Sequence, residues 1–409
     1  MGELQMRSGF IAPLPAGAHA RALASALTSA LLSLSLLLPA PPAAAQADRV
    51  AQGLALQAAR AKFVVVKAKK VFYTRRWDLS GLPSYRPAQR VSGTIEMWGS
   101  NYIEDSNLGR YWEQGFRRYQ PGAHIAFHMK SATAAVPALV FGVADIGVGR
   151  KITFAEQLLY ERYKGRDPLI VTVATGSYNV TGWQPGYGIV VSKVNPVTCL
   201  SMQQLDGIFG AQRTGGWEGT SWHPEWARGP EENVRTWGQL GLTGDWAAEP
   251  INPYGLNLRY HQTAELSDLI LKGSDKWNER LRIYANYVAK DGALGRDLKV
   301  DLAKDRYGIA WIAAPTYKLP PQLKVLAITR RTGDRCVPYT LETIHDRTYP
   351  LFSQIYMFAN RGQHGSVKPL VREFLRYVLS RQGQEAVERD GKYLPLTARV
   401  ARQQAEKIQ

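Results

Sequence analysis

The stretch that decides the fold is Gly93–Lys151, GTIEMWGSNYIEDSNLGRYWEQGFRRYQPGAHIAFHMKSATAAVPALVFGVADIGVGRK. Twice it contains a β-prone run, then a turn of small polar residues, then a helical segment. Thr94–Trp98 predicts the first strand, and Leu108–Tyr119 carries apolar and aromatic residues at close to a helical spacing. His124–Lys130 predicts the second strand, and Ser131 opens an Ala-rich helix. The repeated order indicates an α/β fold.

The two turns share a property that bears on function. Gly99-Ser100-Asn101 and Ser131-Ala132-Thr133 each follow the carboxyl end of a strand and lie near a helix start. Backbone N–H groups point outward at such a place, and the helix dipole adds positive potential, so it suits an anion. Ser and Asn also cap helices without binding any ligand. The sequence leaves both interpretations open.

The pattern of residues 1–47 indicates an export signal, and we do not expect these residues to belong to the folded domain. Two arginines precede the apolar run Ala22–Leu38, and the Ala-Gln-Ala ending at Ala47 matches a signal-peptidase site. We therefore expect a signal peptide at 1–47, cleavage near Ala47 and a periplasmic mature chain from Asp48. An uncleaved anchor is the alternative, but the Pro- and Ala-rich flank favours cleavage. No other apolar run approaches the ~20 residues that a membrane span needs.

Composition narrows the class of partner. Lys and Arg total 51 against 34 Asp and Glu, which gives a formal net charge of +17. A basic exported protein attracts anions, acidic polymers or membrane surfaces. Because the basic residues are dispersed and no recognition motif is present, we expect no nucleic-acid partner.

The cysteines and histidines predict no cofactor. Cys199 and Cys336 are the only cysteines, and the seven histidines show no ligand spacing, so we expect no metal. In an oxidising compartment the two cysteines either form one disulfide or remain as two buried thiols. Both alternatives stay open.

The rest of the chain continues the α/β alternation. Thr153–Tyr163 predicts a helix with a capping box of Thr153 and Glu156, and Ser201–Phe209 predicts another that begins at Ser201. Further along we expect a turn at Pro253–Gly255, a helix from Thr263 and a helix at Lys276–Tyr287. The other expected strands and helices are Leu169–Ala174, Tyr187–Val191, Gly308–Ile312, Lys324–Ile328, Tyr349–Asn360, Val367–Leu379 and Gln382–Arg389.

Two segments stand apart from this alternation. Residues 48–92 are expected to form an N-terminal arm without chemistry of its own. Gly210–Trp246 contains five tryptophans and little periodicity. This Trp-rich segment either presents an aromatic face to sugars or a protein partner, or is a loop-rich lobe held together by its own aromatic side chains.

No enzyme signature is present. The sequence contains no G-x-S-x-G, P-loop, H-E-x-x-H or G-x-G-x-x-G motif, and its carboxylates are too scattered to name a catalytic pair. We therefore expect no enzymatic activity.

Several segments in order resemble the phosphate-type periplasmic binding proteins of ABC transporters. The resemblance runs from about Gly93 to Thr397 and implies two α/β lobes joined by a hinge, with the ligand in the cleft between them. The implied first lobe is 93–184 plus 345–409, and the second is 185–344, carrying the Trp-rich insertion 210–246. The segments are GTIEMWGSN, SATAAVPALVFGVADIGVGRKIT, YGIVVSKVNPVTCLSMQQLDGIFG, RTWGQLG, YPLFSQIYMFAN and EFLRYVLSRQGQEAVERDGKYLPL.

The resemblance also implies which residues hold the anion. In that family, backbone N–H groups and hydroxyls at helix starts bind it, sometimes with an Arg. The second lobe departs from the family pattern, since Leu256 stands where an Arg is plausible and His261-Gln262-Thr263 replaces Ser-Gly-Thr. The candidate ligand-binding residues are Ser100, Asn101, Ser131, Thr133, Gly149, Arg150, Asn257, Arg259 and Thr263.

These observations give two functional hypotheses. The first is a monomeric solute-binding protein that captures inorganic phosphate or a similar oxyanion by cleft closure, for an ABC transporter permease. The second is an exported adhesion or scaffold protein that uses the same fold to bind a polymer or protein through its Trp-rich lobe.

Overall fold

The computed structural model of the chain describes residues 68–258, 261–284, 297–362 and 365–408. Residues 63–409 form one compact unit. The expected signal peptide, and the expected arm as far as residue 67, lie outside the described residues. No helix in the described ranges combines the length and apolarity needed to cross a membrane.

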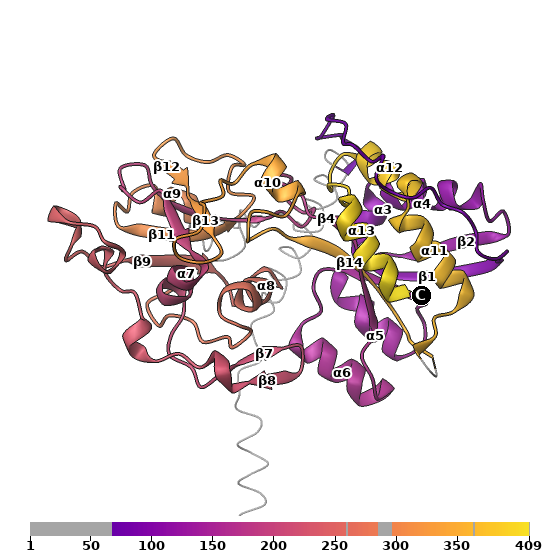
Figure 1. Cartoon of the computed structure of the whole chain (residues 1–409), viewed down its shortest axis with the longest axis horizontal. Coiled ribbons are helices and arrows are strands. Elements are labelled where there is room, and N and C mark those ends of the chain that lie inside the picture. Colours follow the sequence, from indigo (N-terminus) through magenta and orange to yellow (C-terminus); the bar gives the residue numbers. More distant parts are fainter. Residues whose placement is uncertain (1–67, 259–260, 285–296, 363–364, 409) are drawn as a thin grey trace, which may run out of the picture. The chain divides into compact units, whose positions relative to one another are not determined.

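The first sheet has five strands, of which β1, β2 and β3 come from the stretch Gly93–Lys151 (Figure 1). β1 pairs in parallel with β2 and with β3, whereas β14 runs antiparallel to β3 and β4. In sheet order the strands are β2 (Ala123–His128), β1 (Gly93–Gly99), β3 (Ile146–Gly149), β14 (Gln354–Ala359) and β4 (Leu169–Thr175).

Helices pack around this sheet and close its core. Ile95, Met97, Trp112 and Phe374 are fully buried there. α6 begins with the expected capping box, in which Thr153 and Glu156 bond to each other's backbone N–H groups. The helices are α3 (Asn101–Asp105), α4 (Leu108–Arg117), α5 (Ala135–Val140), α6 (Phe154–Lys164), α11 (Pro369–Leu379), α12 (Arg381–Asp390) and α13 (Ala398–Ala405).

The second sheet also has five strands and has a core of its own, in which Trp237 and Trp311 are buried. β10, β9 and β11 are parallel neighbours, and β5 is antiparallel to β11 and β12. In sheet order the strands are β10 (Arg282–Tyr284), β9 (Asn252–Leu256), β11 (Gly308–Ala313), β5 (Tyr187–Ser192) and β12 (Leu323–Val325).

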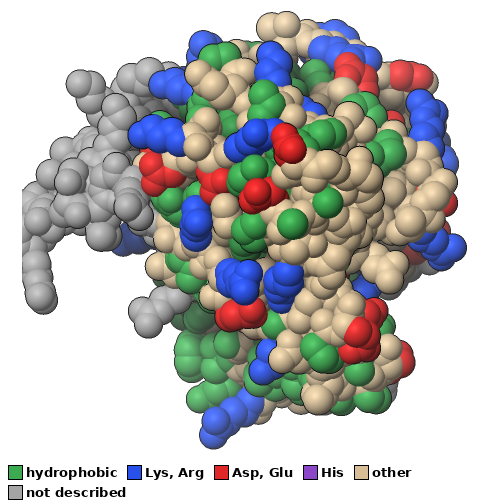
Figure 2. All heavy atoms as spheres, turned by 90° about the vertical axis from the view of Figure 1, so that its left-hand side faces the viewer, with side chains coloured by type: hydrophobic (Ala, Val, Ile, Leu, Met, Phe, Trp, Pro, Cys, Tyr) green, Lys and Arg blue, Asp and Glu red, His purple; other side chains and the backbone are tan. Residues whose placement is uncertain are grey.

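Short elements complete the part around the second sheet. β6 pairs in parallel with β13, and Ser201 caps α7 as expected. Figure 2 shows one side of the molecule, where Lys and Arg side chains alternate with Asp and Glu rather than forming one basic field. The elements are β6 (Cys199–Ser201), β13 (Ala327–Thr329), α7 (Met202–Phe209), α8 (His261–Ile270), α9 (Leu298–Leu302) and α10 (Leu341–His345).

Residues 68–92, expected as part of an arm, pack on the core of the first sheet. Leu82 and Tyr85 are buried there, and the Tyr85 hydroxyl donates a 2.7 Å hydrogen bond to the buried carboxylate of Glu373. The described part of this segment is therefore integral to the fold.

The expected helix at Lys276–Tyr287 is wrong over its described part. Residues 282–284 form the strand β10, which pairs in parallel with β9. Asn278 donates its backbone N–H to Phe209 O and its side-chain amide to Ile208 O, so α7 holds the preceding residues in an irregular conformation. Tertiary pairing overrides the helical pattern here.

The expected turn at Pro253–Gly255 is also wrong, because these residues lie inside β9. A Cβ added to Gly255 would lie 2.5 Å from Trp311 Nε1. The glycine therefore makes room for a tryptophan in the core instead of reversing the chain.

Candidate functional site

The carboxyl ends of β1, β2 and β3 lie at one edge of the first sheet because these strands are parallel neighbours. The backbone N–H of Ser100 donates a 2.8 Å hydrogen bond to Val148 O. Gly99 has φ +137, and an added Cβ would lie 2.0 Å from Val148 O. Only glycine permits this approach. The turn after β1 therefore contacts the end of β3 directly.

The second turn lies beside the same strand end. An added Cβ on Gly149 would be 3.5 Å from Ala132 O. Ser131 precedes a short 3-10 helix, Ala132–Ala134, and its Oγ is 3.4 Å from the Thr133 N–H and 2.8 Å from Thr133 Oγ1. The three turns, after β1, β2 and β3, thus lie side by side at one edge of the sheet, and we call this group of turns the cradle.

The helix-cap interpretation applies to one of these turns and not to the other. Ser131 accepts a capping hydrogen bond, whereas Ser100 stands at the N-cap of α3 without a side-chain cap bond. Asn101 bonds through its amide to Asp105 one turn along α3. The Ser100 hydroxyl instead interacts with the buried Tyr393.

Arg150 brings a nearly buried charge to the cradle. Only 8% of the residue is exposed, and its guanidinium donates to both carboxylate oxygens of Glu156 at 3.2 and 3.4 Å. Nη1 also donates to Lys151 O at 3.0 Å. The Nε–H is buried and has no partner within the described part of the chain. Arg150 therefore retains hydrogen-bonding capacity.

His261, the first residue of α8, lies close enough to Arg150 to be affected by its charge. Burial, together with the smaller effect of the Arg150 charge, lowers the pKa of His261 to about 4. His261 is therefore neutral at pH 7. The family resemblance places His261 where Ser is usual, and this substitution was the only signal in the sequence for its position.

The remaining candidate residues of the second sheet lie around the start of α8. Thr263 is fully buried, and its Oγ1 donates to Asn257 O at 2.9 Å. Leu256 is buried in the core at the end of β9. Arg259, the expected source of charge in this loop, lies outside the described residues.

A cavity of about 270 Å³ opens between the first turns of α6 and α8. Inside it, Lys151 and Asp268 form an ion pair at 2.6 Å. Glu265 is fully buried and accepts hydrogen bonds from Tyr187 at 2.6 Å and Ser353 at 3.0 Å. Burial raises the pKa of Glu265. Sequence reasoning missed this inter-sheet network because its members lie far apart in the chain.

The Trp-rich segment divides into a buried part and a projecting hairpin. Trp237 and Trp246 are buried in the second core and meet edge to face. Trp217 and Trp222 lie on the two strands of the hairpin, β7 (Gly216–Glu218) and β8 (Ser221–His223), with ring centroids 4.9 Å apart. Much of the segment is thus held by its own aromatic rings.

The hairpin also contacts α6 from the other sheet. Thr220 Oγ1 donates a 2.8 Å hydrogen bond to Glu161, and the Trp217 ring lies 4.8 Å from that of Phe154. Phe154 lines the cavity beside α8. The hairpin therefore joins the two sheets next to the candidate site.

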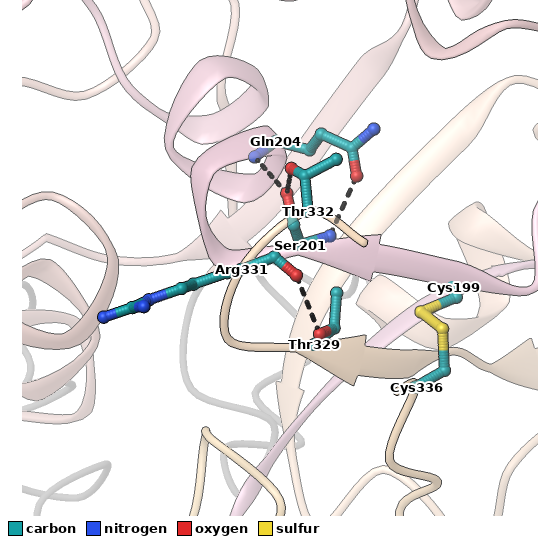
Figure 3. Close-up of a disulfide and its surroundings, with 7 residues drawn as sticks. All are labelled: Cys199, Ser201, Gln204, Thr329, Arg331, Thr332 and Cys336. Carbon is teal, nitrogen blue, oxygen red and sulfur yellow. Dashed lines mark hydrogen bonds between the residues drawn. A yellow bond between two sulfur atoms is a disulfide. The ribbon is translucent and has the colours of Figure 1, made fainter. Parts of the chain in front are cut away.

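Cys199 and Cys336 form a disulfide with an S–S distance of 2.03 Å (Figure 3). It lies beside the paired strands β6 and β13, where Thr332 Oγ1 donates to Ser201 Oγ at 3.1 Å. The described residues contain no group of three or more His, Cys, Asp or Glu side chains that could hold a metal ion.

Comparison with known proteins agrees with this architecture. Residues 104–382 match the model of the PBP superfamily domain. The phosphate-binding protein PstS from two strains of Pseudomonas aeruginosa is 31% identical over 324 residues, covering 78% of this chain and 88% of the relative. The chain therefore belongs to the PBP superfamily and, within it, to the family of phosphate-binding proteins that includes these two relatives.

Similar solved structures are more distant in sequence. An ABC-type phosphate transport receptor from Vibrio cholerae is 16% identical with a TM-score of 0.44, over 73% of this chain and 99% of that one. PstS from Borrelia burgdorferi is 14% identical with a TM-score of 0.46, over 75% of this chain and all of that one.

Proposed function

We propose that this member of the PBP superfamily is an exported solute-binding protein that captures inorganic phosphate or a related oxyanion for an ABC transporter. The observation that carries the proposal is the convergence of three turns and Arg150 at one sheet edge. Backbone N–H groups and a guanidinium are the donors that bind a dehydrated oxyanion without a metal. The relatives' name, phosphate-binding protein, supports the same ligand.

In this proposal the ligand lies between two lobes, 93–184 with 345–409 and 185–344. Ser100, Asn101, Ser131, Thr133 and Gly149 supply N–H and hydroxyl groups from the first lobe, with Arg150 as the charge. The start of α8 closes over them, with Asn257, Arg259 and Thr263 as its candidates.

Closure follows from differential affinity. A ligand that contacts both lobes binds the closed form more tightly and shifts the hinge equilibrium towards it. The chain's role is binding without turnover, and we expect a monomer delivered to the periplasm, where an ABC transporter permease is its partner. Adhesion through the Trp-rich segment has less support, since Trp237 and Trp246 are buried.

Calorimetric titration of the processed protein tests the proposal. Phosphate, sulfate and a phosphonate are titrated separately, and we expect saturable heat with at least one, with phosphate binding tightest. Absence of heat with every oxyanion would contradict the proposal. Tight binding of sulfate or the phosphonate alone would retain the oxyanion class and exclude phosphate as the ligand.

A further inference from the structure

A second cavity lies in the helical layer of the first sheet and shares no residue with the cradle. Its volume is about 550 Å³, and it is lined by the lead-in segment 83–88 together with α11 and α13, which contact each other (Figure 1). The lining residues that matter here are Arg86, Arg372, Arg376, Arg402, Leu379 and Ala405.

Four arginines surround this cavity, and no carboxylate lines it. Arg376 is paired, since it donates to the buried carboxylate of Glu373 at 3.0 Å and to Arg86 O at 3.4 Å. For Arg86, Arg372 and Arg402, no acidic partner is found among the residues that the structure describes. An anion that enters the cavity would therefore meet guanidinium groups that have no acidic partner of their own.

The floor of the same cavity is apolar. Leu379, Ala401 and Ile408 lie beneath it and are at most 3% exposed, whereas Pro83 and Ala88 are exposed and Ala405 is half-buried at its surface. A bare oxyanion would satisfy the arginines but would leave this floor uncovered and most of the volume unfilled. The combination of cationic rim and apolar floor fits a ligand that is anionic at one end and hydrocarbon at the other.

We propose that this cavity binds the phosphate group of an anionic phospholipid, with the glycerol and first acyl carbons over Pro83 and Ala405. Guanidinium groups bind phosphate through paired hydrogen bonds, and arginines near an anionic membrane surface each add to the attraction. The formal net charge of +17 favours the same surface. The first lobe would thereby be held at the membrane while its cradle stays open to solvent.

Vesicle co-sedimentation tests the proposal directly. The processed protein is mixed with phosphatidylcholine vesicles that contain or lack phosphatidylglycerol. We expect binding only with phosphatidylglycerol, and we expect R86Q/R372Q/R402Q to lose about fivefold in partitioning for each arginine removed. The matched control is R330Q/R331Q/R335Q, which removes the same charge from exposed arginines elsewhere and should lose much less.

A second variant tests the cavity without removing an arginine. Ala405→Asp leaves the arginines in place and adds a carboxylate to the cavity, so it should also weaken vesicle binding. All variants should keep the wild-type oxyanion titration, because none changes the cradle, and this distinguishes failure here from failure of the proposed function.

Two results would overturn the proposal. They are wild-type binding that is absent or equal on both vesicle types, and an equal loss in the two triple variants.

Discussion

Arg150 is the residue on which the candidate site depends most. Its guanidinium has five N–H donors, and the contacts within the chain use only some of them. Glu156 holds it in place while also capping α6. Arg150 is thus a fixed charge with donors to spare, which is the arrangement that a preorganised anion site needs.

Replacing Arg150 by Gln should weaken oxyanion affinity by about tenfold to a hundredfold, the effect of losing a charged hydrogen bond. Arg150→Lys should be intermediate, because the charge stays and the planar fork is lost. Calorimetry measures both. Arg162→Gln, an exposed arginine on α6, is the control. Unchanged affinity in Arg150→Gln would move the site elsewhere.

A second residue makes stability depend on pH. His345 stacks on Trp77 with ring centroids 3.6 Å apart, and burial lowers its pKa from 6.5 to about 4. As the pH falls, the unfolded chain therefore binds a proton at this histidine at a higher pH than the folded chain does. Stability is complete above pH 6.5 and falls as the pH drops from 6.5 to 4. His261, with a pKa also lowered to about 4, acts in the same direction.

We expect His345→Phe, which keeps the stacking on Trp77, to flatten the fall of melting temperature between pH 6.5 and 4. His124→Gln, at an exposed histidine, should leave the wild-type slope intact. An identical slope in His345→Phe and wild type would show that this histidine does not titrate as described.

At the scale of elements, local sequence determines where some helices begin, whereas long-range pairing determines the short strands. α6 and α7 begin where a Ser or Thr side chain caps them, and this was readable from the sequence. β6 and β13 are three-residue strands paired across more than a hundred positions of chain, and β10 is equally short. Strands this short depend on their neighbours and on the disulfide beside them.

The disulfide should contribute measurably to stability. Cys199 and Cys336 are separated by 137 positions, so the bond restricts a long loop of the unfolded chain. Cys199→Ser with Cys336→Ser should lower the free energy of unfolding by about 2–5 kcal/mol. Denaturant titration with and without reductant measures this. Wild type should respond to reductant and the double variant should not; an unresponsive wild type would contradict the prediction.

At the scale of the whole molecule, the hairpin β7–β8 is the feature that links the parts around the two sheets beside the site. Its contacts are Thr220 with Glu161 and Trp217 with Phe154. The ion pair Lys151–Asp268 lies in the adjoining cavity. These contacts form only when the two parts approach each other, so they stabilise the closed form without touching the ligand.

Phe154→Ser and Thr220→Val should therefore speed ligand dissociation several-fold, since each removes a contact of roughly 1 kcal/mol that holds the closed form. Stopped-flow tryptophan fluorescence with the bound oxyanion measures the rate. Tyr163→Ser changes an exposed aromatic residue on the same helix, away from the hairpin, and should leave the rate unchanged. Equal rates in all three variants would rule out the hairpin as a closure contact.

The sequence by itself determined the α/β class, the strands β1 and β2, the helices α4 and α5 and the helix caps at Thr153 and Ser201. Each of these rests on residues adjacent in the chain, so local periodicity and capping chemistry suffice to predict them. The turns at Ser100 and Ser131 were predicted for the same reason, because each is formed by a few consecutive residues, whereas Gly149 was proposed from the family resemblance.

Only the tertiary structure decided the rest. Residues 282–284 are a strand because β9 offers them a partner, and Gly255 is glycine because Trp311 occupies the space beside it. The charge of Arg150 acts on His261 although the two residues are more than a hundred positions apart, and no local pattern carries that information. Pairing, close packing and charge proximity between distant segments depend on how the chain is folded in space, and a linear sequence records them only indirectly.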